Sequence, residues 1–263
     1  MAMLSSDQRA NLLVAFLCAV ATLSFIGSRD IEEIRERRLA GTAADVYDHG
    51  HWLLPELQGV PRYLKPPYAD WIAVASMRVL GRNEFGFRLP FALAGLGMIA
   101  VGFALARRMF GPQTARAAAL ILATTPYFIS ECHSPSQDLW LGLFSGAALL
   151  SWWRWQEQAR PASRAWWAFW LCTAFACLFK GPLALAIIGI PVVIELGASR
   201  RWKLGLQMRP WWGLLIVFAL ALPWPLAVWS QHPDYPARLW ADMKISLVKD
   251  ETKHGFSYLN HLI

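Results

Sequence analysis

Long apolar segments separated by short polar links are the feature that most constrains this chain. Of its 263 residues, 56% are hydrophobic and 16% are charged, whereas soluble domains average about 45–50% apolar and about 25% charged residues. A segment of about 20 apolar residues is long enough to cross a bilayer as a helix. The sequence therefore predicts an all-α integral membrane protein with about seven transmembrane helices. The predicted spans are about 11–27, 89–106, 114–130, 139–153, 165–179, 183–197 and 211–229.

The first apolar segment, 11–27, has a second interpretation as a secretory signal peptide. Ala19-Val20-Ala21 resembles a cleavage site. The residues before the segment are only weakly basic, and the apolar run continues past that site. We therefore expect a retained first helix.

Basic residues are distributed unevenly among the links, and this distribution predicts the topology. The links around 107–116, 154–164 and 200–209 are rich in arginine. The links at 131–138 and 180–182 together contain one lysine, Lys180, and no arginine. Because cytoplasmic loops of membrane proteins carry the excess of Lys and Arg, the arginine-rich side and the N-terminus are expected to be cytoplasmic. The same rule accounts for the net charge of +7 without a nucleic-acid partner.

The cysteines and histidines show no pattern typical of a disulfide framework or a metal site. The four cysteines lie in or beside apolar blocks, where they are read as small hydrophobic residues. The histidines lack the i, i+4 or similar spacing of metal ligands. No metal ligand is assigned, and participation of a divalent metal is left open. The residues are Cys18, Cys132, Cys172 and Cys177, and five of the six histidines, His51, His133, His232, His254 and His261.

A long first outer loop, about 29–88, is dense in charges, prolines and aromatic residues. Its part 30–48 has apolar residues at roughly helical spacing and is expected to be an amphipathic surface helix that ends at Gly50. The segment 68–80 is too short to span and is expected to be a second surface helix. Between them Lys65 is followed by two prolines, which fix φ and stiffen the backbone that presents it. The alternative for Lys65 is a solvated loop lysine.

Three other groups of charged residues are candidates for a site on the outer side. Asp138 begins one span and Lys180 ends another, and ionisable residues at such positions usually face a cavity. The alternatives are a helix N-cap for Asp138 and a snorkelling side chain for Lys180. For Arg35 to Arg38 the alternative is binding to anionic lipid head groups. No phosphate-binding glycine loop or catalytic triad is present, so the outer side offers carboxylates and cations. That combination suits a phosphate-bearing substrate with a carboxylate as general base.

Several motifs, in the same order and spacing, resemble a known family. Residues 50–67 (GHWLLPELQGVPRYLKPP) resemble the first-loop signature of the lipid A aminoarabinose transferases and their dolichyl-phosphate-mannose-protein mannosyltransferase relatives. Residues 83–90 (NEFGFRLP) and 107–111 (RRMFG) match the next family segment. Asp138 aligns with the second-loop aspartate of the family and 179–182 (FKGP) with its Lys-Gly-Pro.

The resemblance implies a multi-spanning glycosyltransferase of the C-type superfamily. Such an enzyme takes a sugar from a polyprenyl phosphate and places it on a lipid, glycan or protein acceptor at the outer face of the cytoplasmic membrane, by an inverting displacement. It implies that Lys65, with Arg38, Lys180, Tyr63 and Tyr68, binds the donor. It also implies that Asp138 and an early first-loop carboxylate, Glu36 or Glu33, are catalytic.

The chain departs from the family at one catalytic position. The family usually has Asp-Glu followed two residues later by Arg, and ungapped counting places Arg35, Glu36 and Arg38 there. Glu36 or Glu33 takes over the role, a small gap restores Asp30, or activity is lost. The chain is also expected to be incomplete relative to the family, as a single domain over 1–263 with an outer segment at 231–263. The other candidate functions are a non-catalytic protein that binds polyprenyl phosphate and a transporter of lipid-linked sugars.

Overall fold

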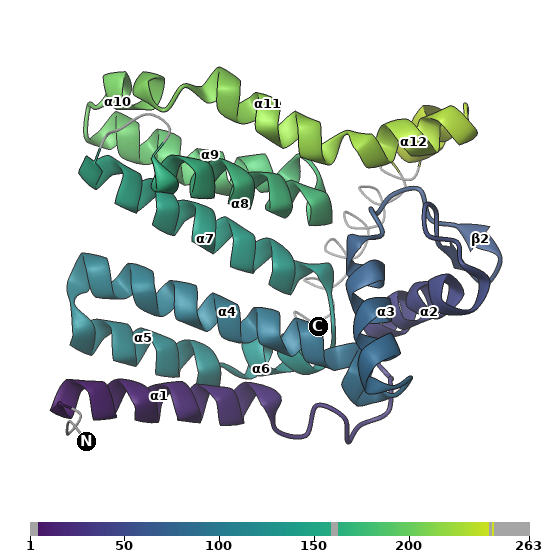
Figure 1. Ribbon diagram of the computed structural model, residues 1–263, viewed down its shortest axis with the longest axis horizontal. Coiled ribbons are helices and arrows are strands. Elements are labelled where there is room, and N and C mark those ends of the chain that lie inside the picture. The colour runs from purple at the N-terminus through teal and green to yellow at the C-terminus, as the bar shows by residue number, and fades with distance from the viewer. Residues whose placement is uncertain (1–4, 159–162, 242–243, 245–263) are drawn as a thin grey trace, which may run out of the picture.

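The computed structural model describes residues 5–158, 163–241 and 244, and these are almost entirely helical (Figure 1). The helices are α1 (Ser6–Leu23), α2 (Ile34–His49), α3 (Tyr68–Leu80), α4 (Glu84–Phe110), α5 (Pro112–Thr124), α6 (Pro126–His133), α7 (Gln137–Gln158), α8 (Arg164–Lys180), α9 (Leu183–Ala198), α10 (Trp202–Gln207), α11 (Pro210–Ala221) and α12 (Pro223–Gln231). A two-residue hairpin, β1 (Glu56–Leu57) and β2 (Val60–Pro61), interrupts the first loop.

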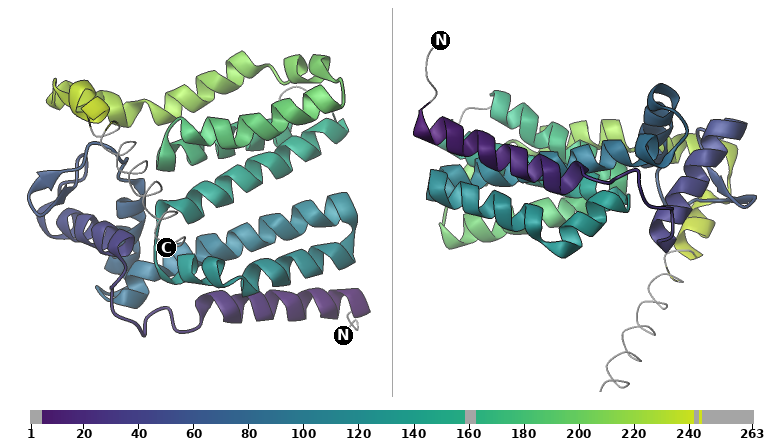
Figure 2. Two further views of the ribbon diagram at one scale, coloured as in Figure 1. Left: turned by 180° about the vertical axis from the view of Figure 1, so that it is seen from behind. Right: turned by 90° about the horizontal axis from the view of Figure 1, so that it is seen from below.

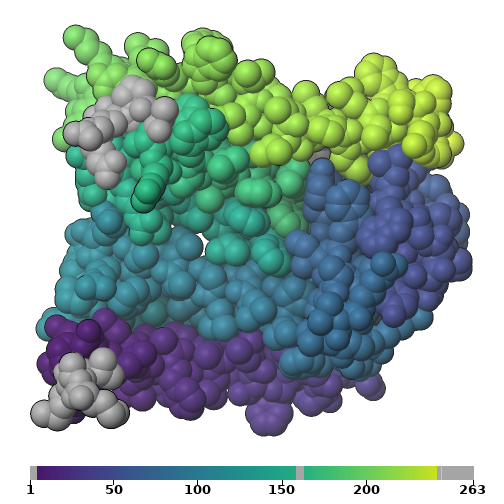
Figure 3. All heavy atoms as spheres, viewed as in Figure 1, coloured from purple at the N-terminus to yellow at the C-terminus, as the bar shows by residue number. Residues whose placement is uncertain are grey.

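The long helices lie side by side along one direction of the molecule (Figures 1 and 2). Helix α4 packs against α1, α5 and α7, and α7 packs in turn against α8, which contacts α9 and α11. In the space-filling view α1 and the α11–α12 pair form opposite edges (Figure 3). The buried apolar residues form one cluster around α1, α3, α4 and α5 and a second around α7, α8, α9 and α11.

All seven predicted apolar segments are mostly helical, and two of them are each divided into two helices. The segment 114–130 is divided at Thr125 between α5 and α6. Pro126 has no backbone N–H to donate within a helix interior, and it instead begins α6. The segment 211–229 is likewise divided into α11 and α12, which are bent by 42°. Pro223 stands at the first position of α12, where proline is tolerated.

One helix among the described residues, α4, is both long and apolar enough to cross a membrane by itself, and α11 with α12 meets the same criterion as a bent pair. Helix α9 is apolar but has only 16 residues. Many large apolar side chains nevertheless point outward, including Phe16, Ile194 and Phe218. Patches of this kind mark contact with a partner or a lipid phase. The number of seven spans stays a prediction.

The first loop is confirmed as two helices, which gather at one end of the stack of long helices (Figures 1 and 2). The Glu33 side chain caps α2 by accepting from the Glu36 backbone N–H, and α2 ends at Gly50, whose φ of 75° lies in the left-handed region that favours glycine. The link between α4 and α5 and the link between α9 and α11 lie at the opposite end. The helical stack therefore separates the arginine-rich links from the first loop.

Candidate active site

A small polar cavity, of about 70 Å³, opens where the first loop meets the ends of α7 and α8. Segments that are distant in sequence contribute to it: α2, the loop on either side of the hairpin, the first turn of α3, the start of α7 with the residues before it, and the last residue of α8. Its lining is dominated by charged groups of both signs. The charged residues are Arg35, Arg38, Arg62, Lys65, Asp70, Asp138 and Lys180.

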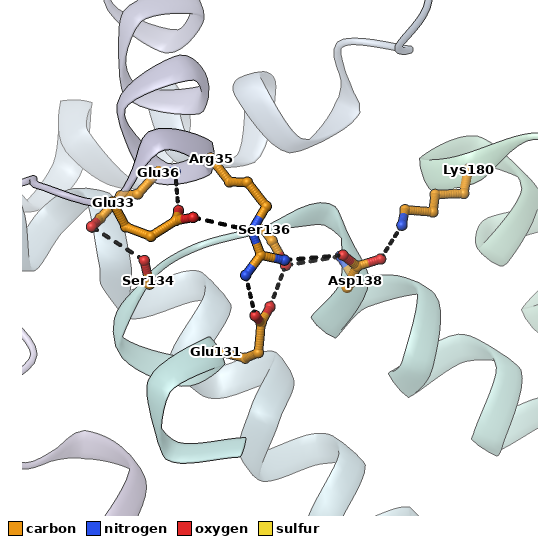
Figure 4. A network of polar contacts seen from close by, with 8 residues as sticks. All are labelled: Glu33, Arg35, Glu36, Glu131, Ser134, Ser136, Asp138 and Lys180. Atoms are coloured by element: carbon orange, nitrogen blue, oxygen red, sulfur yellow. Dashed lines mark hydrogen bonds and ion pairs between the residues drawn. The ribbon is translucent and has the colours of Figure 1, made fainter. Parts of the chain in front are cut away.

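Asp138 lies between two cations in this cavity (Figure 4). Lys180 forms an ion pair with one of its carboxylate oxygens, and Arg35 Nη1 lies 3.9 Å from the other. The Asp138 backbone N–H donates to the Ser136 hydroxyl, so a serine precedes the helix and supports its start. Asp138 and Lys180, two of the candidates for a site on the outer side, are therefore in direct contact. The cation at the end of α8 is held by the carboxylate at the start of α7.

Arg35 extends from α2 to Glu131, a residue that the sequence analysis did not select (Figure 4). Its Nη2 donates to Glu131 Oε1 at 2.6 Å, and its Nε donates to Glu33 Oε1 at 3.2 Å. Glu131 is 8% exposed at its side chain and also accepts from the Ser136 hydroxyl at 2.8 Å. An aspartate at position 35 would bring a second negative charge toward this buried carboxylate. Arg35 and Glu131 therefore compensate each other.

Glu36, predicted as a catalytic base, does not line the cavity. Its carboxylate accepts from Arg88 Nε at 2.6 Å and from the Ser134 hydroxyl at 3.4 Å, and both members of the ion pair are buried. Glu33, the other candidate, caps α2 and pairs with Arg35, and it is also outside the lining. The structure gives both glutamates partners that account for their positions.

Asp70 is a buried carboxylate that lines the cavity and that the sequence analysis missed. It is 5% exposed and accepts a hydrogen bond from the Thr42 hydroxyl on α2. No Lys or Arg among the described residues forms an ion pair with it. Burial raises its pKa to about 6, against the opposing effects of Thr42 and the positive charge of Arg62. The sequence feature that could have identified it is its position in the first turn of α3, five residues after Lys65, among residues that are otherwise apolar on the buried face of that helix.

Lys65 and Lys180 also line a second cavity, which is larger and mostly apolar, with a volume of about 530 Å³. Half of its lining residues belong to α8, α9, α11 and α12. The Lys65 side chain is exposed by surface area, yet the protein atoms packed around it, together with the positive charges of Arg62 and Lys180, hold its pKa below the ordinary lysine value. No carboxylate of the described residues forms an ion pair with Lys65. A cation that forms no ion pair within the described part of the chain thus lies where the two cavities meet.

The two tyrosines predicted to bind substrate have different surroundings. Tyr68 lines the apolar cavity, where its ring packs edge-to-face on Trp71. Tyr63 lines neither cavity. It is buried in a third apolar cluster with Leu54, Trp224 and Tyr235. Tyr63 therefore joins the first loop to the end of the chain that follows α12.

Gln137 is the third residue that both cavities share. It is 6% exposed, and its amide nitrogen donates to the Pro66 carbonyl at 3.4 Å. Its amide oxygen is buried and has no hydrogen-bond partner among the described residues. A buried acceptor without a partner is destabilising by about 1–3 kcal/mol. A ligand hydroxyl or amine at the junction of the cavities would supply the missing donor.

Comparison with known proteins places this arrangement in a family. Residues 64–229, more than half of the chain, match the family model described as "Dolichyl-phosphate-mannose-protein mannosyltransferase". The chain is 28% identical over 231 residues to the undecaprenyl phosphate-alpha-4-amino-4-deoxy-L-arabinose arabinosyl transferase of Pseudomonas savastanoi pv. phaseolicola, covering 86% of this chain and 42% of the relative. The corresponding protein of Shewanella sediminis is 28% identical over 215 residues, covering 80% of this chain and 39% of the relative.

The fold is also similar to that of a solved structure. The crystal structure of ArnT from Cupriavidus metallidurans bound to undecaprenyl phosphate superimposes with a TM-score of 0.75 at 23% identity, covering 88% of this chain and 43% of that one. Its apo form gives a TM-score of 0.77 over 90% of this chain. The chain spans about two-fifths of the length of these relatives. With the family model matched across its cavity-lining lysines and its aspartate at 138, the chain belongs to the dolichyl-phosphate-mannose-protein mannosyltransferase family.

Proposed function

We propose that this chain carries the donor site of a membrane glycosyltransferase that takes a sugar from a polyprenyl phosphate. Its curated relatives are named as transferases of 4-amino-4-deoxy-L-arabinose from undecaprenyl phosphate. The acceptor is a lipid, with glycan and protein acceptors as the alternatives that family membership leaves. The proposal rests on the shape and charge of two adjoining cavities.

The single observation that carries the proposal is that Lys65, Gln137 and Lys180 line both cavities at once. A polyprenyl phosphate sugar has three parts of different chemistry: an apolar chain, an anion and a polar sugar. The apolar cavity of about 530 Å³ suits the first prenyl units, the two lysines suit the phosphate, and the polar cavity suits the sugar.

The charges at the junction suit the chemistry of glycosyl transfer. The bond between the sugar and the phosphate breaks with positive charge developing on the sugar and negative charge on the leaving phosphate. Lys65, Lys180 and Arg38 would stabilise that negative charge, more strongly because apolar walls exclude water nearby. Gln137 would accept a hydrogen bond from a sugar hydroxyl or amine and so fix the orientation of the ring.

The carboxylate that accepts the proton of the acceptor is proposed to be Asp70 or Asp138. Asp138 lies in the cavity but is already paired with Lys180 and Arg35, so it holds these cations in place. Asp70 has no ion-pair partner in the described part of the chain, and its pKa of about 6 gives a stronger base than an ordinary aspartate that is still ionised near neutral pH. A general base contributes about 10²–10⁴-fold to the rate.

The location follows from the separation of charges in the fold. The site lies at the end of the helical stack that holds the first loop, opposite the arginine-rich links. If those links face the cytoplasm, the cavity opens on the outer face of the cytoplasmic membrane. The proposal includes the seven spans and a single domain. It needs no nucleotide, since the donor arrives in the membrane.

A second candidate function is binding of polyprenyl phosphate without transfer, and one observation favours it. The guanidinium of Arg35 lies in the cavity and contacts Glu131, Glu33 and Asp138. Arg35 partly neutralises these three carboxylates. It stands at the position where the family resemblance places an aspartate. In this reading Asp70 has no catalytic role, and Lys65 and Lys180 still bind the phosphate.

The experiment that separates these functions measures donor binding and turnover in the same preparation. The purified full chain in detergent micelles would be given undecaprenyl phosphate, and then undecaprenyl phosphate carrying 4-amino-4-deoxy-L-arabinose or a hexose with a lipid acceptor. Release of undecaprenyl phosphate and appearance of glycosylated acceptor support transfer. Binding without release, with Lys65→Ala weakening the binding, supports the second function. Absence of binding contradicts both.

A further inference from the structure

A second cluster of ionisable residues lies outside both cavities, where α2 passes into the hairpin. Asp45, His51 and Glu56 each present one potential ligand atom, and the three atoms lie within 4.8 Å of one another. None of the three lines the polar or the apolar cavity. The cluster is therefore separate from the proposed donor site.

Local backbone geometry brings these side chains together. Asp45 lies in the last part of α2, and Gly50, with a φ of 75°, reverses the chain so that His51 returns to the side of Asp45. The Glu56 backbone N–H donates to Asp45 Oδ2 at 2.8 Å and ties the beginning of β1 to the helix. His49 Nδ1 lies 3.1 Å from Asp45 Oδ1. The Asp45 carboxylate is thus fixed by contacts on both of its oxygens.

The basic side chains that pair with the cluster, among the described residues, are the imidazoles of His49 and His51, which both contact Asp45. Asp45 and Glu56 place two carboxylates within 4.8 Å, and no Lys or Arg of the described residues forms an ion pair with either. Asp45 has only 13% of its side chain exposed, so water screens it incompletely. Two adjacent carboxylates repel each other unless a proton or a cation lies between them. A divalent cation with a neutral imidazole would bring the net charge of the site to zero.

The spacing of His51 and Asp45 is close to that of two ligands on one tetrahedral metal. His51 Nδ1 lies 3.1 Å from both Asp45 oxygens. Two ligand atoms each about 2.0–2.2 Å from one zinc ion, at a tetrahedral angle, lie about 3.4 Å apart. One imidazole and two carboxylates form a ligand set of the kind zinc accepts, with the fourth position left for water.

We propose that Asp45, His51 and Glu56 bind one zinc-class divalent cation that fastens the end of α2 to β1. His49 contacts Asp45 Oδ1 and orients the carboxylate. The sequence did not indicate this site, because its ligands include only one of the histidines and two acids with no metal-binding spacing. The hairpin that it fastens leads directly to Arg62 and Lys65. The metal ion therefore has a structural role in the loop that presents the Arg62 and Lys65 side chains to the cavity.

The test uses the purified full chain, stripped of metal with a chelator and titrated with Zn²⁺ at pH 7.5 by calorimetry. One Zn²⁺ per chain is expected. His51→Ala, Asp45→Asn and Glu56→Gln are each expected to lower the affinity by tenfold or more, and His232→Ala, a histidine outside the cluster, to leave it unchanged. Co²⁺ supplies a second readout, since its visible absorption reports coordination, and this absorption is expected to be lost in the same three variants.

Glu56→Gln keeps the backbone N–H that holds Asp45, and circular dichroism would verify that each variant is folded. Absence of Zn²⁺ binding by the folded wild-type chain would overturn the proposal. Binding that the three variants leave unchanged would overturn it equally, because the cation would then lie elsewhere. Neither result bears on the donor site, since binding of undecaprenyl phosphate is measured separately.

Discussion

Arg88 and Glu36 form an ion pair in which both side chains are buried, with 1% and 0% exposed, although 52 residues separate them. Arg88 Nε donates to Glu36 Oε1 at 2.6 Å, and its Nη1 and Nη2 groups donate to backbone carbonyls of residues 26, 29 and 30. One arginine on α4 therefore holds both α2 and the segment that leads to it. The contact is structural, and it positions the loop that carries the cavity.

Glu36→Gln is expected to destabilise the fold, because it leaves the Arg88 guanidinium buried with a neutral partner. Removing one member of a buried ion pair costs about 3–5 kcal/mol. Chemical unfolding in detergent micelles would measure the loss. Asp48→Asn provides the matched control, since its pair with Arg82 is exposed and such pairs contribute about 0–1 kcal/mol. Equal stability of the two variants would contradict a structural role for Glu36.

Lys65→Ala and Lys180→Ala are each expected to weaken binding of undecaprenyl phosphate by about 10–100-fold, because a hydrogen bond to a charged group contributes about 1.5–3 kcal/mol. Lys180→Ala should have an additional effect, since it leaves Asp138 with Arg35 alone at 3.9 Å. Binding would be measured by microscale thermophoresis. Lys203→Ala, which changes a lysine in the arginine-rich link at the other end of the fold, should bind as the wild type does.

Asp70→Asn is expected to remove the acid limb of the pH dependence of transfer. A base acts only when deprotonated, and burial raises the pKa of Asp70 to about 6. The wild-type rate should therefore fall as the pH drops through about 6. The variant should be slower by about 10²–10⁴-fold and flat across this range. An unchanged acid limb in Asp70→Asn would assign the titration to another group, with Asp138 as the next candidate.

The same substitution is expected to stabilise the folded chain at neutral pH. The pKa of Asp70 is raised in the folded state, so the folded chain binds more protons than the unfolded chain between about 4 and about 6, and stability falls as pH rises through this window. A difference of about two pKa units corresponds to at most about 3 kcal/mol. Asparagine still accepts from Thr42 and carries no charge. Unfolding of Asp70→Asn and wild type should differ at pH 7 and converge at pH 4.

The elements could be predicted from sequence more completely than the contacts between them. Apolar periodicity and Gly50 predicted the two helices of the first loop. The family resemblance selected Lys65, Asp138 and Lys180, which line one cavity in the structure. Single residues inside apolar runs were harder: Pro126 and Pro223 stood within predicted spans, yet each begins a new helix. The sequence placed Glu36 beside Arg35 but could not show which of the two faces the cavity.

That choice depends on helix rotation and on distant partners. Adjacent residues of a helix point about 100° apart, so a difference of one position moves a side chain from the cavity to the interior. Glu36 turns toward Arg88 of α4, and Arg35 turns toward Glu131 of α6. Asp70 was missed because its burial comes from α2, which is a packing relationship that spacing along the chain does not contain.

Labelling from the two sides of the membrane tests the arrangement on which the outer-face proposal depends. Ser199 follows α9 at the arginine-rich end of the stack, whereas Gln231 ends α12 near the first loop. Ser199→Cys and Gln231→Cys are therefore expected to react with an impermeant maleimide from opposite faces of sealed vesicles, Gln231→Cys from the outside. The wild type is the control, since its native cysteines are buried except for Cys172, which is half-buried. Reaction of both variants from the same face would show that α11 and α12 do not together cross the membrane, and the cavity would then lose its outer-face assignment.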